Sequence, residues 1–378
     1  MSTTLVITND FPPRQGGIET FVHAMVTRMP GDVVVYTSRE PGMDAYDRTL
    51  PFPVIRDSMR NLLPTPRVTR RAMELARAYG CDRAWFGAAA PLAYMAPDLR
   101  RAGVRRMVAT THGHEIWWAR TPAARRVLRR IGDHVDVVTY LGEYTRSRIA
   151  PALGPRARMS RLTPGVDAAE FRPDRAAEGR RAVRERHGIG ADRKVVLCAA
   201  RLVPRKGQDT LIRALPRILR DIPEAVLLVV GRGPDEQRLR KLARECPGGT
   251  VVFAGGRTHA EMADYYAASD VFAMPCRTRK GGLEAEGLGI VFLEAAASGL
   301  PVVVGDSGGA PDAVRHGENG HVVDGRDVTA VAGAVVAALE SPDLSAEMGE
   351  RGRKWVEESW SWDASVKHLS ELLSPSGT

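Results

Sequence analysis

Residues 284–312 read EAEGLGIVFLEAAASGLPVVVGDSGGAPD, and this stretch decides the fold class. A helix is expected to begin near Gly287–Ile290, and the short apolar run Pro301–Val304 follows it as a strand. A helix that leads into a strand apolar on both faces is typical of a parallel sheet covered by helices. The stretch also holds Glu286 and Glu294 in apolar surroundings, where an isolated carboxylate is costly. Either both carboxylates reach solvent or both have partners.

Ten further short apolar runs alternate with helical, amphipathic segments along the chain. In order, they cover residues 4–8, 33–37, 83–86, 107–111, 135–140, 194–199, 225–230, 250–254, 271–274 and 320–323. This alternation predicts an α/β protein with two doubly wound, Rossmann-like domains that face each other across a cleft. The stretch 164–193 interrupts the series and is rich in turn residues and charge, so we expect the domain boundary there.

The charge of the chain is uneven. Its formal net charge is +9, but residues 1–165 hold 25 arginines, no lysine and 14 acidic residues, whereas residues 166–378 carry slightly more acidic than basic residues. The asymmetry indicates either an anionic partner for the N-terminal half or a solvated, arginine-rich surface. A nucleic-acid-binding module is disfavoured, because the arginines are not interleaved with aromatic residues and no recognition motif is present.

The sequence predicts a cytoplasmic protein without a membrane span. No run approaches the roughly 18 apolar residues of a spanning helix, and the N-terminal MSTTLVITNDFPP reads as a first strand, not as a signal peptide. The four cysteines are scattered and form no CxxC pair, so we expect reduced thiols.

The loops that follow the strands are the places to look for chemistry, because ligands of such sheets bind beyond the carboxyl ends of the strands. RLVPRKGQDTL, residues 201–211, gathers Arg201, Arg205 and Lys206 beside Gly207, just before a predicted helix. Cations next to a helix amino end predict a clamp for a diphosphate. The motif is not a P-loop, since GxxxxGK[ST] is absent.

Three other loops carry weaker signals. NDFPPRQGGIET places Gly16 and Gly17 before a helix, where backbone amides can approach an anion, although a structural turn explains them equally well. FAGG, followed by Arg257, could present backbone groups to a base or be a simple turn. In THGHE, His112 could donate a hydrogen bond to a sugar hydroxyl or a phosphate, or be a structural histidine whose partners lie within the protein. A metal site is disfavoured because no further ligand cluster follows.

Glu286 is expected in the loop before the predicted helix and Glu294 about one turn into it, on the same side to within roughly 80° at about 100° per residue. Both carboxylates can therefore line one wall of a cleft. Because a carboxylate is a strong acceptor for vicinal hydroxyls, one could hold a transferred sugar and the other the ribose of a nucleotide. The alternative is two exposed or capped glutamates.

Taken together, these motifs resemble the retaining GT-B glycosyltransferases of family 4, and more narrowly the actinobacterial PimB-type mannosyltransferases. The resemblance covers essentially the whole chain and rests on TNDFPPRQGGIE, WFGAAAPLA, THGHE, LRRIGD, RLVPRKGQDTL, DVFAMPCRTR and EGLGIVFLEA. It implies a nucleotide-sugar donor, GDP-mannose, and transfer of α-mannose to a phosphatidyl-myo-inositol mannoside. It also implies an acceptor-binding domain over 1–165, a nucleotide-sugar-binding domain over 166–357, and a last helix, 358–374, that crosses back onto the first domain.

The resemblance assigns a role to each candidate residue. Arg201 and Lys206 would hold the donor diphosphate, with Gly16 and Gly17 approaching it from the other domain. Glu286 and the amides of Gly289, Ile290 and Val291 would hold the transferred sugar and the phosphates. Glu294 would hold the ribose, the backbone near Arg257 would meet the guanine, and His112 would contact the sugar. No cofactor and no metal are expected, because cations and helix amides already face the charge that develops on the diphosphate.

The implied acceptor is a phosphoinositide-type lipid at the cytosolic membrane face. The basic segment 56–80 supplies Arg56, Arg60, Arg67, Arg70 and Arg71, each worth about 1 kcal/mol near an anionic surface. We therefore expect a peripheral protein on the inner face of the cell membrane, with no nucleic-acid partner. Asp312 and Leu141-Gly142-Glu143 depart from the family pattern, and the second departure bears on the acceptor.

Three alternatives to this function remain open. The first is a family-4 enzyme with another nucleotide sugar or a soluble inositol or natural-product acceptor. The others are a basic nucleic-acid-binding module and a sugar epimerase of the same fold.

Overall fold

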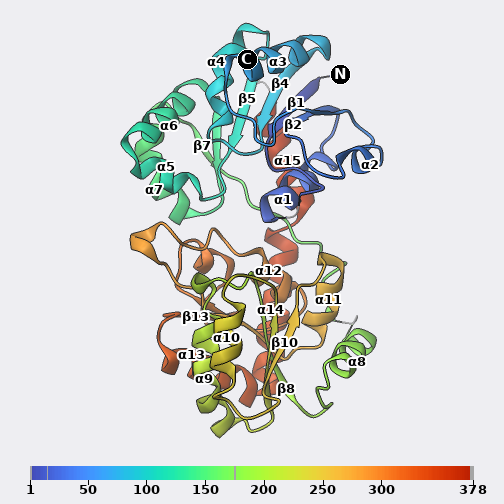
Figure 1. The fold of residues 1–378 in the computed structure, drawn as a ribbon, viewed down its shortest axis with the longest axis vertical. Helices are drawn as coiled ribbons and strands as arrows, with labels where there is room; N and C mark the ends of the chain where they lie inside the picture. Colours follow the sequence, from blue (N-terminus) through green and yellow to red (C-terminus); the bar gives the residue numbers. More distant parts are fainter. Residues whose placement is uncertain (1, 15, 174–175, 375–378) are drawn as a thin grey trace. The chain divides into compact units, whose positions relative to one another are not determined.

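A computed structural model describes residues 2–14, 16–173 and 176–374 of the chain. The chain forms two compact units, Met1–Gly165 with Trp362–Thr378, and Val166–Ser361 (Figure 1). Residues 174 and 175, inside the segment expected to hold the domain boundary, lie outside the described residues. Each unit has a parallel sheet and helices of its own.

The N-terminal unit contains a seven-stranded sheet of order β3-β2-β1-β4-β5-β6-β7, in which each pair of neighbours is parallel. Its strands are β1 Thr3–Thr8, β2 Asp32–Thr37, β3 Val54–Arg56, β4 Cys81–Phe86, β5 Arg106–Thr110, β6 Val137–Tyr140 and β7 Met159–Arg161. Its helices are α1 Gly17–Val26, α2 Met43–Asp47, α3 Pro66–Ala78, η1 Leu92–Met95, α4 Ala96–Arg101, α5 Glu115–Arg120, α6 Pro122–His134, α7 Glu143–Leu153 and α15 Trp362–Leu373.

Apolar side chains cover both faces of this sheet. Along β1, Leu5 and Ile7 belong to one buried cluster and Val6 to another, because successive side chains of a strand point to opposite faces. The first cluster packs against α3, α4 and α6, and the second against α1 and α15. Strands buried on both sides explain the near-continuous apolar runs that predicted a parallel sheet.

Helix α15 belongs to the N-terminal unit although it lies at the end of the chain. Its residues Val366, Leu369 and Leu373 are buried in the cluster that contains Val6. The guanidinium of Arg106 also donates a hydrogen bond of 2.7 Å to the carbonyl of Leu372. Apolar burial and this bond together fix the last helix on the sheet.

The C-terminal unit contains a six-stranded parallel sheet of order β10-β9-β8-β11-β12-β13. Its strands are β8 Lys194–Ala199, β9 Ala225–Val230, β10 Val251–Gly255, β11 Val271–Met274, β12 Val302–Gly305 and β13 Gly320–Val323. Its helices are α8 Ala176–Arg186, η3 Pro204–Lys206, α9 Gln208–Asp221, α10 Glu236–Ala243, α11 His259–Ala267, η4 Lys280–Gly282, α12 Ile290–Ala297, η5 Ala310–Ala313, α13 Val328–Glu340 and α14 Pro342–Ser359.

The predicted α/β class with two parallel sheets is confirmed, and the eleven expected strands are all present. Two strands were missed, β3 and β7, which form the two edges of the N-terminal sheet. Each is only three residues long, ends in arginine and has no fully buried residue, so neither has the apolar run that marks a central strand.

Among the described residues, no single helix is long and apolar enough to cross a bilayer. One sharply bent combination, Val328–Glu340 with Pro342–Leu373, reaches the required length and composition.

Candidate active site

The loop after β8 places two cations at the amino end of α9. The 3₁₀ turn η3 carries Arg205 and Lys206, and Gly207 then starts the helix with a positive φ of 79°. A Cβ on Gly207 would lie 2.0 Å from the carbonyl oxygen of Pro275, so only glycine fits between this turn and the chain after β11. The glycine therefore fixes the position of the two cations.

Glu286 is the partner of both cations. The ammonium of Lys206 lies 2.7 Å from Glu286 Oε2, and the guanidinium of Arg205 donates to the same oxygen at 2.8 Å. The carboxylate is buried at 8% exposure, and its own backbone is tied to the turn after β12, where the amide of Gly309 donates to the Glu286 carbonyl. Lys206 is buried as well, so this is a desolvated pair, in which removal of one partner is costly.

The two cations keep Glu286 ionised. Burial by itself raises the pKa of a carboxyl, but the charges of Lys206 and Arg205 outweigh burial and hold the pKa of Glu286 below its usual range. One carboxylate faces two cations, so the group retains net positive charge. Such a group suits a ligand with more than one negative charge.

Arg201 lies on the same loop but is arranged differently. Its backbone carbonyl accepts hydrogen bonds from the amide of Val203 at 2.9 Å and the side chain of Gln208 at 3.3 Å, while the side chain is exposed. The two predicted diphosphate ligands therefore differ. Lys206 forms an ion pair with Glu286, whereas the side chain of Arg201 is exposed to solvent. Sequence reasoning placed Arg205 in the cation cluster but did not include it among the site residues.

The predicted amides lie at the amino end of α12. Gly289 precedes the helix with a φ of 84°, and a Cβ there would lie 2.4 Å from the Phe292 ring. The helix begins at Ile290, so the amides of Ile290 and Val291 belong to the first turn, which has no intrahelical carbonyl to bind. Within the described part of the chain, no side chain caps this helix end. These amides are available to an anion.

Glu294 has a separate set of partners. The hydroxyl of Tyr266 donates to Glu294 Oε2 at 2.8 Å, and His259 Nδ1 lies 3.8 Å from Oε1. Burial raises the pKa of Glu294, and the nearby His259 and Tyr266 counter this only in part. Of the two possibilities for Glu286 and Glu294, exposure to solvent or burial with partners, the structure shows the second. Both are buried, and the partners are cations for Glu286 and a phenol for Glu294.

Arg257 follows β10, as expected. Its guanidinium donates to the carbonyl of Ala254 at 2.6 Å and lies over the ring of Tyr265, 5.6 Å from the centroid. The side chain therefore braces the end of β10. Whether the backbone here meets a base stays a prediction.

In the N-terminal unit, Gly16 and Gly17 lie at the start of α1. His112 lies in the loop after β5, where Glu115 accepts hydrogen bonds from the amides of His112 and Gly113 at 3.0 and 3.1 Å. The ring of His112 packs edge-on against Phe21 at 5.3 Å. Glu115, fully buried, thus holds the THG backbone in place, a role that sequence reasoning missed.

The contacts of His112 reverse its expected hydrogen-bonding role. Its Nε2 lies 2.6 Å from the carbonyl oxygen of Gly87, which can only accept, so Nε2 carries the proton. Burial lowers the pKa of His112, which favours the neutral ring. The remaining Nδ1 can then accept a hydrogen bond but not donate one.

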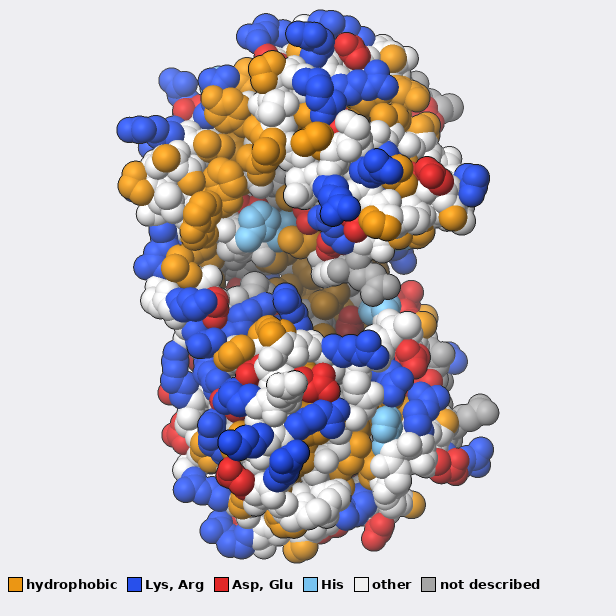
Figure 2. All heavy atoms as spheres, viewed as in Figure 1, with side chains coloured by type: hydrophobic (Ala, Val, Ile, Leu, Met, Phe, Trp, Pro, Cys, Tyr) orange, Lys and Arg blue, Asp and Glu red, His pale blue; other side chains and the backbone are white. Residues whose placement is uncertain are grey.

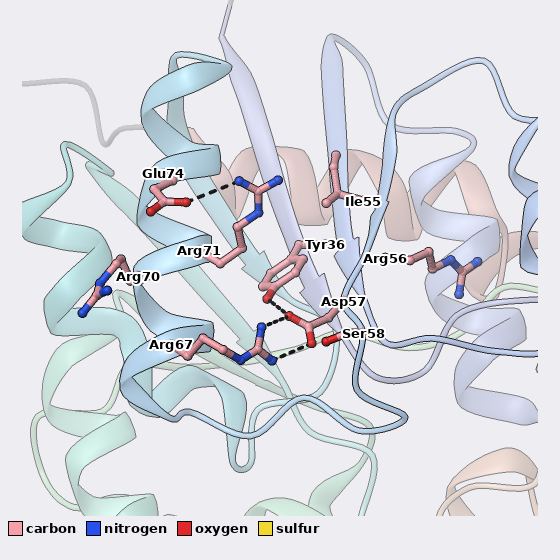
Figure 3. Close-up of a pocket in the computed structure, with 9 residues that line it drawn as sticks. All are labelled: Tyr36, Ile55, Arg56, Asp57, Ser58, Arg67, Arg70, Arg71 and Glu74. Carbon is pink, nitrogen blue, oxygen red and sulfur yellow. Dashed lines mark hydrogen bonds and ion pairs between the residues drawn. The ribbon is translucent and has the colours of Figure 1, made fainter.

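The arginines of segment 56–80 differ widely in environment. A pocket of about 370 Å³ is lined by Tyr36, Ile55, Arg56, Asp57, Ser58, Arg67, Arg70, Arg71 and Glu74 (Figure 3). Asp57 is buried and binds the guanidinium of Arg67 through both oxygens, at 2.6 and 3.0 Å, and also accepts from the hydroxyl of Tyr36. Burial alone would raise the pKa of Asp57, but the bonds from Arg67 and Tyr36 lower it to about 2.

Arg56 does not belong with the exposed arginines. Its side chain is only 7% exposed, and it binds Asp47 at 2.7 Å and the carbonyl of Ser38 at 3.1 Å. It points away from the Asp57 carboxylate in Figure 3. Inclusion of Arg56 in the membrane-facing set is therefore not supported, because its charge is already neutralised inside the unit. Arg60, Arg67, Arg70 and Arg71 are exposed, and Arg71 pairs with Glu74 at 3.3 Å.

In residues 2–14, 16–173 and 176–374, no group of three or more His, Cys, Asp and Glu side chains is arranged to hold a metal ion. The expectation of a metal-independent reaction stays a prediction.

Two doubly wound sheets, with two cations on a buried carboxylate and an uncapped helix amino end, are what a glycosyltransferase of the GT-B class requires. Comparison with protein families agrees with this. Residues 15–170 match the model described as Glycosyltransferase Family 4, and residues 179–355 match Glycosyl transferases group 1.

Several relatives match over nearly the whole chain, among them the following two. The GDP-mannose-dependent alpha-(1-6)-phosphatidylinositol monomannoside mannosyltransferase of Mycobacterium tuberculosis is 49% identical, covering 99% of this chain and 98% of the relative. The GDP-mannose-dependent monoacylated alpha-(1-6)-phosphatidylinositol monomannoside mannosyltransferase of Corynebacterium glutamicum is 44% identical, covering 98% of this chain and 97% of the relative. The chain belongs to the same family, the family-4 glycosyltransferases of GT-B fold.

A solved structure supports the fold. Anabaena HepE in complex with UDP has a TM-score of 0.80 to this chain, covers 99% of both chains and is 19% identical. At this identity the likeness concerns the fold alone.

Proposed function

We propose that this glycosyltransferase moves α-mannose from GDP-mannose to a phosphatidyl-myo-inositol mannoside, with retention of the anomeric configuration. The observation that carries the proposal is the group formed by buried Lys206 and Glu286 with partly exposed Arg205, which has net positive charge and an ionised carboxylate. Two relatives with this named activity, 44% and 49% identical over almost the full chain, support the choice of donor and acceptor.

The chemistry assigned to the C-terminal unit is electrostatic. When the bond between the mannose anomeric carbon and the diphosphate oxygen breaks, the electron pair remains on the diphosphate. Lys206, Arg205, Arg201 and the first amides of α12 stabilise that charge, an effect that commonly contributes about 10²- to 10³-fold to a rate. Because these groups already supply positive charge, we propose that the reaction needs no metal.

Glu286 has a second task in this proposal. An ionised carboxylate accepts hydrogen bonds from sugar hydroxyls, and Lys206 and Arg205 keep it ionised. The acceptor hydroxyl attacks the anomeric carbon on the face that the diphosphate leaves, and its proton passes to a phosphate oxygen of the donor. The unprotonated Nδ1 of His112 accepts a hydrogen bond from a hydroxyl of the mannose.

The acceptor proposed here is a lipid, so the enzyme is assigned to the cytosolic face of the membrane. Figure 2 shows basic side chains, which are arginines in residues 1–165, at the end of the N-terminal unit that carries α3 and α4. In segment 56–80, Arg60, Arg67, Arg70 and Arg71 are exposed, and so are Met59 at 53% and Leu63 at 55% exposure. Arginines near an anionic surface with two exposed apolar side chains favour peripheral docking.

The function is tested by mass spectrometry of reaction mixtures with a panel of donors and acceptors. The donors are GDP-mannose, GDP-glucose and UDP-glucose. The acceptors are vesicles with phosphatidylinositol monomannoside, vesicles with phosphatidylinositol, and soluble inositol phosphate, and a further reaction contains no acceptor. The proposal is supported if GDP-mannose adds one hexose to the monomannoside and does so in the presence of EDTA, which removes free metal ions. Transfer to inositol phosphate alone would point to a soluble acceptor, and turnover without acceptor would point to an epimerase.

A further inference from the structure

Tyr266 is the one close hydrogen-bond donor to the Glu294 side chain in the described part of the chain. Its hydroxyl lies 2.8 Å from Glu294 Oε2, and both side chains are buried, at 0% and 4% exposure. The tyrosine comes from α11 and the glutamate from the second turn of α12. A buried phenol–carboxylate bond is therefore built between two helices of the C-terminal unit.

The tyrosine ring is fixed by its neighbours. Phe171 packs edge-on against it with ring centroids 5.7 Å apart, and Phe272 packs at 5.8 Å on a tilt. The ring therefore has little freedom to turn, and its hydroxyl stays at one point beside α12. A hydrogen bond from such a fixed donor sets the plane of the carboxylate that receives it.

The other carboxylate oxygen is less engaged. His259 Nδ1 lies 3.8 Å from Glu294 Oε1, which is longer than a hydrogen bond. His259 is 54% exposed on its side chain and also lies 3.9 Å from Glu170, so it is shared between two carboxylates. Since a carboxylate can accept several hydrogen bonds, Glu294 retains capacity for a ligand on this side.

We propose that Tyr266 is a positioning residue, which orients the Glu294 carboxylate so that it accepts both hydroxyls of a nucleotide ribose. The inference rests on the proposed function, which assigns Glu294 to the ribose, and names the residue that makes this recognition specific. A cis-diol presents two donors at a fixed spacing, so a carboxylate that can rotate binds it less well than one held in plane.

Tyr266→Phe tests this proposal, with Tyr265→Phe as the matched control. Tyr265 is the preceding residue of α11 and is equally buried, but its hydroxyl lies 2.9 Å from His187 Nε2. Each substitution removes one buried hydroxyl from the same helix. The measurement is calorimetric binding of GDP and of its 2′,3′-dideoxy analogue, with UDP and dideoxy-UDP as a second pair.

The expected result is a loss of ribose discrimination in one variant only. Tyr266→Phe should weaken binding of GDP by about tenfold, the range of one hydrogen bond to a charged group, and leave the dideoxy analogue within about twofold. Tyr265→Phe should change neither. In the free protein, the pKa of Glu294, measured by ¹³C NMR of the glutamate carboxyls, should rise in Tyr266→Phe and not in the control.

Equal weakening of GDP and its dideoxy analogue would overturn the proposal, since Tyr266 would then act on the pocket as a whole. Undiminished GDP binding with an unchanged Glu294 pKa would overturn it too. Failure of the proposed function shows itself differently: the wild type would bind nucleotides with ribose discrimination and yet transfer no mannose to lipid.

Discussion

Lys206 and Glu286 form a buried ion pair, with the ammonium 2.7 Å from Oε2 of the carboxylate, in a unit whose helix ends supply further positive potential. The pair joins the loop after β8 to the loop before α12, which are 80 residues apart in the sequence. Its geometry explains how an acidic and a basic side chain can both be buried here: each desolvated charge compensates the other.

Lys206→Gln removes a cation from the site and leaves Glu286 with Arg205 as its remaining cation. We expect kcat/KM for mannosyl transfer to fall about 100-fold or more, since charge on the leaving diphosphate is less well stabilised. The unfolding free energy should fall by about 2 kcal/mol, because a buried carboxylate loses a charged hydrogen-bond donor. Steady-state kinetics and urea unfolding measure the two effects.

The control for Lys206→Gln is the double variant with Glu286→Gln. The double variant removes both charges of the ion pair. Much of the lost unfolding free energy should therefore return, while kcat/KM for mannosyl transfer stays low. Recovery of transfer in the double variant would contradict the assigned role of the cation.

The two glutamates should act on stability in opposite directions as pH changes. The pKa of Glu286 lies below its ordinary value of 4.5, so its ionisation stabilises the folded state above pH 4.5 and this contribution is lost as pH falls through the lowered pKa. The pKa of Glu294 lies above 4.5, so its ionisation costs stability as pH rises from 4.5 through the raised pKa.

Melting temperatures from pH 3 to pH 8 of wild type, Glu286→Gln and Glu294→Gln test these opposite signs. The Glu286→Gln variant should lose less stability than the wild type on acidification below pH 4.5. The Glu294→Gln variant should gain relative to the wild type as pH rises above 4.5. Parallel curves for all three proteins would rule out the described environments.

Gly289→Ala should damage the amino end of α12. The residue has a φ of 84°, which disfavours a side chain, and a Cβ would lie 2.4 Å from the Phe292 ring. We expect a loss of about 1–3 kcal/mol in unfolding free energy and weaker donor binding, because the first amides of the helix move. Calorimetry with GDP and thermal unfolding provide the measurements.

Gly333→Ala is the matched control for Gly289→Ala. Gly333 lies inside α13, where nothing is within 4 Å of a Cβ, so the substitution should stabilise the helix by about 0.5–1 kcal/mol. Equal effects of the two substitutions would show that the turn before α12 is not constrained as described.

Arg70→Gln combined with Arg71→Gln should reduce binding to vesicles that contain phosphatidylinositol. With about 1 kcal/mol for each arginine near the surface, we expect a reduction of roughly 30-fold at low salt, and a smaller one at high salt. Arg181→Gln combined with Arg220→Gln removes the same charge from exposed positions of the C-terminal unit and should have little effect. Equal losses for both double variants would mean that net charge, not this segment, governs binding.

The sequence was sufficient to predict most of the fold, because central parallel strands carry their own apolar signal. Residues 194–199, 225–230, 271–274 and 320–323 form strands with the predicted bounds. The two edge strands escaped, since a strand of three residues with a terminal arginine has no such signal.

The candidate site was less predictable, because its partners come from distant parts of the chain. The sequence identified Lys206 and Glu286 separately, yet only the fold reveals that they pair, with Arg205 on the same oxygen. Tyr266 has no sequence motif at all and becomes visible through its bond to Glu294. Arg56 shows the reverse error: an arginine in a basic segment can be an internal brace, which composition does not reveal.

The most direct test of the account is the transfer of radiolabelled mannose from GDP-mannose to vesicles carrying phosphatidylinositol monomannoside, with wild type and Glu286→Gln in parallel. The wild type should transfer label to the lipid, and Glu286→Gln should transfer at least about 100-fold less, in line with loss of one preorganised group. Absence of label with the wild type, or equal label with both proteins, would contradict it.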